Sequence, residues 1–291
     1  YFPSEQTMIS GLNAFKATHS RGILLLIVTT VIWGTSFPLL KQAMQDLPAE
    51  IILAARFTIA ALAFAPWLRQ LDRRLLRDGV LLGCLYFTEC ATALVGLASI
   101  SANRSAFIVS LNAILVPIFA GLMGRRLPVR IVWAAGLAIA GIGILSWEGG
   151  GISRGDWLTL GCAIGVAIYI LTLEVVTPRH PTLPLVAVQL SVMALLSLVW
   201  AAPQLVGQAE AIAQHFDKFL YIGLVVTATP IWTQAIAQRW VAAHEAALIY
   251  TLEPVFASVF SFLLLGEQLG WRGWVGAALV LTATVWSQRK S

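Results

Sequence analysis

Long apolar stretches alternate with short polar connections along almost the whole chain. A membrane-spanning helix needs about 20 mostly apolar residues to cross roughly 30 Å of hydrocarbon. Ten stretches meet this requirement, at residues 21–43, 51–68, 75–98, 103–123, 130–147, 155–176, 184–203, 217–240, 244–265 and 271–287. The connections are short and contain helix-breaking prolines and glycines. The pattern predicts an all-α polytopic membrane protein with ten transmembrane helices.

The composition narrows the function classes. Of the 291 residues, 58% are hydrophobic and 11% are charged, whereas a soluble domain carries about 25% charged residues. So few polar side chains cannot coat a water-soluble protein, which excludes a soluble enzyme, a disordered chain and a nucleic-acid-binding protein. Cys84, Cys90 and Cys162 lie inside apolar stretches, a pattern that argues against a disulfide framework and a zinc site. We therefore expect no metal and no cofactor.

The basic residues predict the orientation. With the amino terminus placed in the cytoplasm, thirteen Lys and Arg residues fall on the cytoplasmic side: Lys16, Arg21, Arg69, Arg73, Arg74, Arg77, Arg125, Arg126, Arg130, Arg179, Arg239, Arg289 and Lys290. Five fall on the other side: Lys41, Arg104, Arg154, Lys218 and Arg272. The positive-inside rule then predicts a multi-pass membrane protein with both termini cytoplasmic. The net charge of +5 indicates topology and not an anionic partner.

Weak internal similarity divides the chain into two halves. An offset of 133 aligns Arg21-Gly22 with Arg154-Gly155, and an offset of 142 aligns the segments 124–127 and 266–269. We predict a cytoplasmic tail over residues 1–20, a first five-helix repeat over 21–147 and a second over 154–287. Because five is odd, the second repeat is inverted, a recurring plan of transporters. The alternative is an old duplication in a membrane protein that transports nothing.

Three segments carry a resemblance to a known family. They are Ala246-Ala-Leu-Ile-Tyr-Thr-Leu-Glu-Pro254 with the later Leu264-Leu-Gly-Glu-Gln-Leu269, Trp33-Gly34-Thr35-Ser36-Phe37, and Arg56-Phe57. Together they resemble the EamA-like branch of the drug/metabolite transporter superfamily. The resemblance implies ten helices in two inverted repeats that move a small metabolite across the inner membrane, often outward. Within that branch the chain is most similar to bacterial exporters of amino acids, including aromatic ones.

The first half departs from the family pattern. Asn112 stands where the family has a proline, Pro117 follows five residues later, and Arg125 matches Glu267 of the second half.

Two carboxyl groups lie deep in predicted spans. Glu89 is about 14 residues, or roughly 20 Å, into its span, and Glu253 about nine residues, or roughly 14 Å, into its own. Burial favours the neutral form of a carboxyl, so each could exchange a proton or accept a substrate ammonium group. The alternative is a hydrogen-bonded carboxyl that fixes helix packing. We favour that alternative for Glu253, which adjoins Pro254, and leave both open for Glu89.

Aromatic residues supply the remaining candidates for a binding site. Most tryptophans fall near span ends and form the expected interfacial belt, but Trp33 and Trp232 do not. Buried tyrosines and tryptophans need partners that lipid cannot supply. The candidate substrate-binding residues are Trp33, Ser36, Tyr86, Glu89, Tyr169, Trp232 and Tyr250, with Glu89 and Glu253 as candidates for proton coupling. For each single aromatic residue, ordinary helix packing is an equal alternative.

Other polar and special residues have structural interpretations beside functional ones. Pro38, Pro117, Pro230 and Pro254 are predicted hinges or kinks, and fixed kinks satisfied by residues such as Ser36 and Thr229 are the favoured version. For Arg56 we favour a structural role over a clamp for a substrate carboxylate. The motifs Gly79-x3-Gly83 and Gly161-x3-Gly165 permit close helix contacts, which we expect within one chain, consistent with a monomer.

These observations predict a secondary transporter and not an enzyme. The chain has no Gly-x4-Gly-Lys-Ser/Thr loop, so ATP hydrolysis is excluded as the energy source. We predict export of neutral, aromatic or otherwise large amino acids and related metabolites by alternating access, with membrane lipid as the only other partner. The alternatives are efflux of lipophilic cations, which an aromatic cavity also accommodates, and a membrane-embedded enzyme or sensor.

Overall fold

The computed structural model describes residues 5–69, 71–125, 129–147 and 152–288. Over these residues the chain is helical and contains no strand, which confirms the predicted all-α class. The α-helices are α1 (Glu5–Ala43), α2 (Ala49–Phe64), α3 (Arg73–Leu97), α4 (Ala102–Val109), α5 (Asn112–Leu122), α6 (Val129–Trp147), α7 (Arg154–Val176), α8 (Thr182–Leu205), α9 (Ala209–Gln214), α10 (Phe216–Tyr221), α11 (Thr229–Ala237), α12 (Ala243–Tyr250), α13 (Glu253–Leu265) and α14 (Trp271–Gln288). Short 3-10 segments are η1 (Ala65–Arg69), η2 (Thr177–Arg179) and η3 (Val206–Gln208), and η4 (Ile222–Ala228) is a π-helix.

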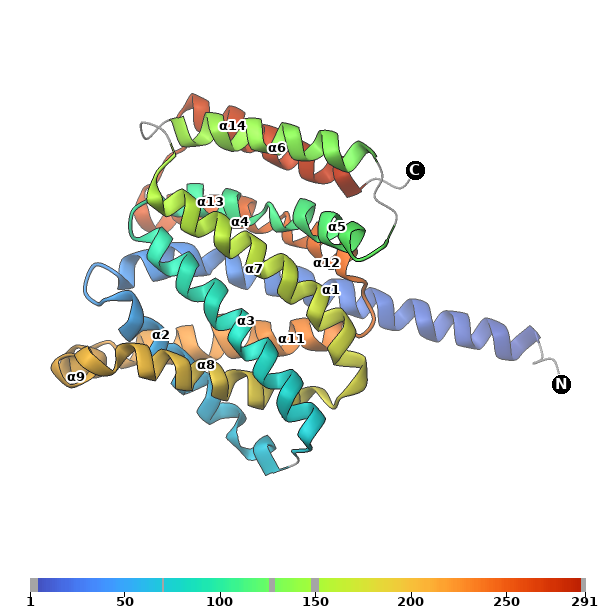
Figure 1. The fold of residues 1–291 in the computed structure, drawn as a ribbon, viewed down its shortest axis with the longest axis horizontal. Helices are drawn as coiled ribbons and strands as arrows, with labels where there is room; N and C mark the ends of the chain where they lie inside the picture. The colour runs from blue at the N-terminus through green and yellow to red at the C-terminus, as the bar shows by residue number, and fades with distance from the viewer. Residues whose placement is uncertain (1–4, 70, 126–128, 148–151, 289–291) are drawn as a thin grey trace.

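Eight of the predicted spans are long and apolar enough to cross a membrane. They are Thr18–Ala43, Ala49–Arg69, Arg73–Leu97, Ala102–Leu122, Arg154–Arg179, Thr182–Leu205, Phe216–Ala237 and Ala243–Leu265. The other two predicted spans form helices α6 and α14, which pack against each other at the top of the bundle in Figure 1. The chain is therefore a multi-pass membrane protein with eight clear candidate spans among the described residues.

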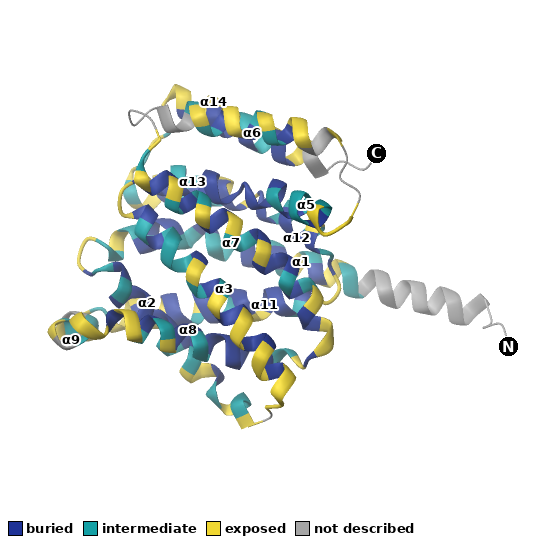
Figure 2. Cartoon of the chain, in the orientation of Figure 1, coloured by how far each residue is buried: buried dark blue, intermediate teal, exposed yellow. Residues whose placement is uncertain are grey.

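The exposed surface agrees with a lipid environment. Figure 2 shows buried residues on the inward faces of the helices and many exposed residues on the outward faces. Many large apolar side chains are exposed on the outside of the bundle, among them Leu122, which is 81% exposed, and Trp271, which is 72% exposed. Extended apolar surface of this kind is costly in water and is expected against hydrocarbon.

The ends of the helices are specified locally. Asp72 precedes α3 and accepts hydrogen bonds from the backbone N–H groups of Arg74 and Leu75, as N-cap residues do. These two bonds lower the pKa of Asp72. At the start of α7, Ser153 and Asp156 form a reciprocal capping box.

Three predicted spans are interrupted near their middle. The span 103–123 breaks between α4 and α5 at Ser110–Leu111, and the span 244–265 breaks between α12 and α13 at Thr251–Leu252. The span 217–240 passes from α10 through η4 into α11. The predicted kink residues Pro230 and Pro254 lie next to two of these interruptions, whereas the sequence did not predict the break at Ser110–Leu111.

The four predicted kink prolines occupy two kinds of position. Pro230 and Pro254 lie in the first turns of α11 and α13, where a missing N–H costs nothing. Pro38 and Pro117 lie inside α1 and α5, and the break in the first half comes before Asn112 and not at Pro117. Beside Pro230, Thr229 donates its hydroxyl hydrogen to the carbonyl oxygen of Leu224 at 2.9 Å, an oxygen that also accepts from the Thr229 backbone N–H.

The helices pack in a regular set of pairs. The largest contacts join α6 with α14, α3 with α7 and with α8, α2 with α8, and α1 with α13 and α11. Further pairs join α2 with η4, and α7 with α4 and α5. Helix α1 begins and α14 ends at the same end of the bundle (Figure 1).

Some predictions fall wholly or partly outside the described residues. Helix α1 starts at Glu5, so most of the segment 1–20 predicted as a tail is part of a continuous helix, and residues 1–4 are not described. Arg126, Arg289 and Lys290, which entered the charge count, also lie outside the described residues.

Small residues allow the close contact between α3 and α8, and this contact supports a prediction. Replacing Gly83 with valine is expected to lower the free energy of unfolding by about 1–3 kcal/mol. A Cβ atom there would lie 2.7 Å from Val192 Cβ and 2.9 Å from the Gln189 carbonyl oxygen. Gly161→Val is the matched control, because a Cβ at Gly161 meets nothing within 4 Å. Thermal unfolding in detergent measures both variants, and equal shifts would contradict the prediction.

Candidate functional site

A cavity lies in the middle of the bundle, between the helices of the two halves. Its wall comes from α1, α2, α3, α4 and α5 of the first half and from α7, η4, α11, α12 and α13 of the second. Its volume is about 110 Å³, which is several times the roughly 10–15 Å³ that one water molecule needs. The wall is mostly apolar with a few polar groups, the usual character of a small-molecule site.

Most of the predicted site residues meet in this cavity. Trp33 and Ser36 come from α1, Tyr86 and Glu89 from α3, and the other three are Tyr169, Tyr250 and Glu253. The structure thus brings together residues that are up to 220 positions apart in the sequence (Trp33 to Glu253).

Trp232 is the predicted site residue that the structure does not bring to the cavity. Its side chain is 37% exposed and lines a surface groove with Trp67 and Trp240. Gln234, two residues later on α11, lines the cavity instead. Successive helical residues are about 100° apart, so residues 232 and 234 point to nearly opposite sides. Depth in the span alone could not predict which side Trp232 takes.

The aromatic residues form two pairs. Tyr86 of α3 and Tyr169 of α7 have ring centroids 5.0 Å apart in an edge-on arrangement. Trp33 of α1 and Tyr250 of α12 have centroids 5.2 Å apart. Both pairs join a helix of one half to a helix of the other. Aromatic pairs of this geometry add about 0.5–1.5 kcal/mol beyond their burial, so the same rings hold the halves together and line the cavity.

The hydroxyl groups of the two inner tyrosines differ. The Gln189 side-chain amide donates to the Tyr169 hydroxyl oxygen at 2.9 Å. The Tyr250 hydroxyl is buried and has no hydrogen-bond partner among the described residues. The hydrogen bond from Gln189 of α8 therefore holds the Tyr169 hydroxyl in place. The Tyr250 hydroxyl is free to form a hydrogen bond with a molecule in the cavity.

Three acidic or basic side chains line the cavity, and all three are largely buried. Glu89 is 5% exposed, Arg56 7% and Glu253 9%. No ion pair joins any of them to an opposite charge within 4.0 Å among the described residues. Arg56 donates from Nη2 to the Cys90 sulfur at 3.1 Å and lies over the Phe57 ring at 4.5 Å. Buried charges are normally paired, so this cavity departs from ordinary core packing.

Unpartnered polar atoms converge on the same cavity. Five cavity residues carry a buried polar atom without a hydrogen-bond partner among the described residues: Arg56 Nε, Glu89 Oε2, Asn112 Oδ1, Gln234 Oε1 and the Tyr250 hydroxyl oxygen. Such atoms are uncommon in folded proteins because each costs free energy. Five of the eleven such atoms among the described residues belong to cavity residues.

Sequence reasoning missed polar cavity residues, three of which carry an unpartnered polar atom. Arg56 was given a structural role, although its position beside Phe57 in a family motif could have raised its weight. Asn112 was noted only as a departure from a proline, and Gln234 was not considered. A polar residue in the middle of an apolar stretch is the signal that could have found both.

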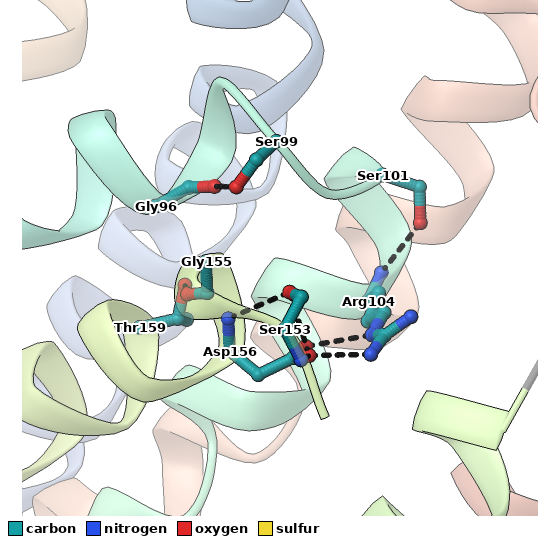
Figure 3. Close-up of polar contacts among 8 residues, drawn as sticks. All are labelled: Gly96, Ser99, Ser101, Arg104, Ser153, Gly155, Asp156 and Thr159. Carbon is teal, nitrogen blue, oxygen red and sulfur yellow. Dashed lines mark hydrogen bonds and ion pairs between the residues drawn. The ribbon is translucent and has the colours of Figure 1, made fainter. Parts of the chain in front are cut away.

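A buried ion pair joins two helices at the α1–α2 end of the bundle (Figure 3). Arg104 of α4 and Asp156 of α7 point toward each other, and Nε of Arg104 donates to Oδ1 of Asp156 at 2.7 Å. A second bond joins Nη2 to Oδ2. Asp156 also accepts from the backbone N–H and the hydroxyl of Ser153. The side chains are 11% and 4% exposed, so this pair ties two helices of opposite halves.

The α2–α3 end carries a more exposed contact between the corresponding helices, α1 and α12. There Glu245 of α12 is the acidic partner, and His19 of α1 contacts it at 3.1 Å. At the α1–α2 end, α4 supplies the basic residue and α7 the acidic one. At the α2–α3 end, α1 supplies the basic residue and α12 the acidic one. Both ties join helices of opposite halves.

A second set of contacts also occurs at both ends. At the α1–α2 end, Glu267 accepts from the backbone N–H groups of Ala102 and Asn103 at the start of α4. At the α2–α3 end, Glu174 accepts from the backbone N–H of Ala243 at the start of α12 and pairs with Arg125 at 3.0 Å. Carboxylates are favourable at helix N-termini. Glu267 therefore stabilises the first turn of α4, and Glu174 stabilises the first turn of α12.

The chain is similar in sequence to proteins named as transporters and similar in fold to a solved structure. A family model described as "EamA-like transporter family" matches the chain twice, at residues 20–147 and 153–288. A protein of Archaeoglobus fulgidus named "Uncharacterized transporter" is 29% identical over 89% of this chain and 83% of its own length. A protein of Streptantibioticus cattleyicolor named "Probable terminal-alkyne amino-acid exporter" is 25% identical over 94% of this chain and 95% of its own. A solved crystal structure shares the fold with a TM-score of 0.65 at 18% identity, covering 92% of this chain and 96% of that chain.

Proposed function

Because the chain belongs to the EamA-like transporter family, we propose that it exports neutral amino acids with large side chains, aromatic ones among them, by alternating access across the bacterial inner membrane. The observation that carries the proposal is one central cavity that combines aromatic pairs with buried acidic and basic side chains that form no ion pair among the described residues. The relative named as an amino-acid exporter supports the substrate class. The family and the relatives named as transporters support transport as the function.

An inverted five-helix repeat is the architecture behind this proposal. The same family model matches each half. Packing supports the inversion: with spans one to five matched to six to ten, the contact of α3 with α7 corresponds to that of α11 with α1, and the contact of α1 with α13 to that of α7 with α5. The fourth span of each half is interrupted, at Ser110–Leu111 and Thr251–Leu252. Discontinuous helices at the repeat interface are typical of secondary transporters.

The turn after each interrupted span gives further support. Gly124 and Gly266 are the two residues with positive φ among those described, at 90° and 66°. They are 142 positions apart, which is the offset of the repeat. Both glycines follow the second piece of the interrupted span, where a left-handed residue ends a helix.

Alternating access requires that each end of the bundle can open in turn. The ties at the two ends, Arg104–Asp156 and His19–Glu245, join corresponding helix pairs of the proposed repeat. In this mechanism one tie breaks while the other holds. By the positive-inside rule the α1–α2 end faces the periplasm and the α2–α3 end the cytoplasm, with both termini cytoplasmic and a single chain sufficient for the cycle.

Within the cavity, each proposed residue has a role. Trp33, Tyr86, Tyr169 and Tyr250 form the wall that contacts the substrate side chain, and Ser36 adds a polar contact. Glu89 accepts the ammonium group or a proton. Trp232 is left out of this set because it lies in a separate groove.

Transport by the purified protein in liposomes tests the proposal. We expect uptake of labelled tryptophan and phenylalanine well above the rate of empty vesicles. Trp33→Leu is expected to lower phenylalanine transport at least about tenfold, because Trp33 lines the cavity and pairs with Tyr250. Trp232→Leu is the matched control and is expected to retain transport, because its side chain faces the outer groove.

Three results would count against this function. If tryptophan, phenylalanine and threonine all fail to cross above the background rate, the substrate class is wrong. If a quaternary dye crosses and no amino acid does, the protein is an exporter of lipophilic cations, which an aromatic cavity with carboxylates also suits. If Trp232→Leu impairs transport as much as Trp33→Leu, the cavity is not the site.

A further inference from the structure

Arg56 is a buried cation in a place where folding alone gives no reason for one. It lies on α2, seven residues after Ala49, and therefore about 10 Å from that end of the helix. Its neighbours are the Cys90 sulfur and the Phe57 ring, and its Nε has no hydrogen-bond partner among the described residues. A structural arginine in a membrane protein would be paired with a carboxylate or would reach the interface. Arg56 does neither.

Glu89 lies at the same level of the bundle. It is eight residues before Leu97, the last residue of α3, and so about 12 Å from the same end as Arg56. It adjoins Cys90, to which the Arg56 guanidinium is bonded. The backbone of α7 packs closely against Glu89 at Gly165, because a Cβ atom at Gly165 would lie only 3.1 Å from Glu89 Cβ. One carboxylate oxygen, Oε2, has no hydrogen-bond partner among the described residues.

A cation and a carboxylate therefore line one cavity at one depth without forming an ion pair with each other. In a low-dielectric site two such groups attract strongly. Keeping them apart is useful when a ligand with both charges is inserted between them. Such a ligand is compact, zwitterionic and neutral overall.

We propose that Arg56 and Glu89 form a split-charge site for the α-amino acid zwitterion, with Arg56 binding the substrate carboxylate and Glu89 the ammonium group. This inference rests on the proposed function and specifies its recognition chemistry. Arginine suits the role because its planar fork matches a carboxylate in a bidentate geometry. The neutral oxygens of Asn112 and Gln234 supply further acceptors for the ammonium group. The aromatic pairs then receive the side chain.

The site explains selection for amino acids over simpler amines or acids. An amine without a carboxylate leaves Arg56 unmatched, and an acid without an ammonium group leaves Glu89 unmatched. A buried charge left without its partner costs more than the contact gains. Amino acids carry both groups at a fixed separation, so side-chain identity can vary while the charged ends stay the same.

Competition against labelled L-phenylalanine in proteoliposomes tests the assignment. The competitors are unlabelled L-phenylalanine, phenethylamine, which lacks the carboxylate, and 3-phenylpropionate, which lacks the ammonium group. In the unaltered protein we expect L-phenylalanine to compete at least about tenfold better than either analogue. In Arg56→Gln the preference for L-phenylalanine over phenethylamine is expected to vanish. In Glu89→Gln the preference over 3-phenylpropionate is expected to vanish.

Two further variants separate recognition from folding. Arg56→Lys keeps the charge and is expected to retain part of the preference, because lysine binds a carboxylate as a point charge. Arg77→Gln is the control, because the Arg77 side chain is 79% exposed and lies outside the cavity. Monodispersity and thermal unfolding in detergent establish that each variant is folded.

The outcomes distinguish this inference from the function on which it rests. If neither L-phenylalanine nor any other labelled amino acid is transported, the proposed function fails. If L-phenylalanine is transported and both Gln variants bind all three compounds in the original order, the function stands and the split-charge site is overturned. An exchange of the two specificity changes between the variants would also overturn the assignment.

Discussion

Replacing Asp156 with asparagine is expected to lower the free energy of unfolding by about 3–5 kcal/mol. The change removes the carboxylate from a bidentate pair in which the Arg104 and Asp156 side chains are 11% and 4% exposed. Breaking a buried ion pair by removing one partner leaves the other charge uncompensated, and losses of about this size follow. Asp156 also accepts from the backbone N–H and hydroxyl of Ser153 at the start of α7, so the cap of that helix is weakened at the same time.

Reversible unfolding in mixed micelles of dodecyl maltoside and SDS measures the effect. Asp46→Asn is the matched control, since Asp46 is 57% exposed and faces His215 at 3.6 Å, a contact worth about 0–1 kcal/mol. Replacing both members of the buried pair, with Arg104→Met and Asp156→Leu, is expected to recover most of the loss because no charge stays buried. A loss for Asp156→Asn no larger than that of Asp46→Asn would show that the pair is not a structural tie.

The spans were predictable because hydrophobicity over about 20 residues is a property of the sequence alone. Each of the ten predicted stretches contains helix in the structure. The break at Ser110–Leu111 was not predicted, because it depends on contacts between helices and no proline or glycine marks it in the sequence. Pro117, the expected kink, lies inside α5, and the break precedes Asn112.

The cavity was predictable in part for a similar reason. Depth along a span places Trp33, Tyr86, Glu89 and Tyr250 near the middle of the bundle, and the structure brings them to one cavity. Depth does not give the direction of a side chain around its helix. Trp232 is as deep as Trp33 but faces outward, whereas Gln234 faces the cavity. The periodicity of apolar residues cannot show which side of a helix faces the cavity, because these helices are apolar on all sides.

Arg56 illustrates the limit of reasoning from a position along one helix. Seven residues from the end of α2, a long side chain could reach water, so a structural role was the simpler interpretation. The structure places it against Cys90 and at the depth of Glu89. That neighbourhood comes from the packing of α2 beside α3, which no local pattern encodes.

Glu89→Gln is expected to abolish the response of transport to an imposed pH gradient and to slow export at low substrate concentration at least about tenfold. Glu89 faces the cavity together with Glu253 and Arg56. Two carboxylates and one cation in a low-dielectric cavity carry least electrostatic cost when one carboxyl holds a proton. A carboxyl that binds either a proton or the substrate ammonium group couples the two movements, because each displaces the other. Acid on the outer side then promotes substrate release there, and the proton returns inward on the same carboxyl.

Efflux of labelled phenylalanine from proteoliposomes with an acidic exterior measures this coupling. We expect acidification to accelerate efflux by the unaltered protein and to leave the Glu89→Gln variant unchanged. Glu253→Gln is the matched comparison: it alters the same residue type in the same cavity and is expected to keep most of the response, because Glu253 begins α13 beside Pro254 and has a structural interpretation there. If Glu253→Gln loses the response and Glu89→Gln keeps it, the proton is carried by Glu253. In that case Glu89 acts on the ammonium group alone, and the two functions that we assign to one carboxyl belong to separate residues.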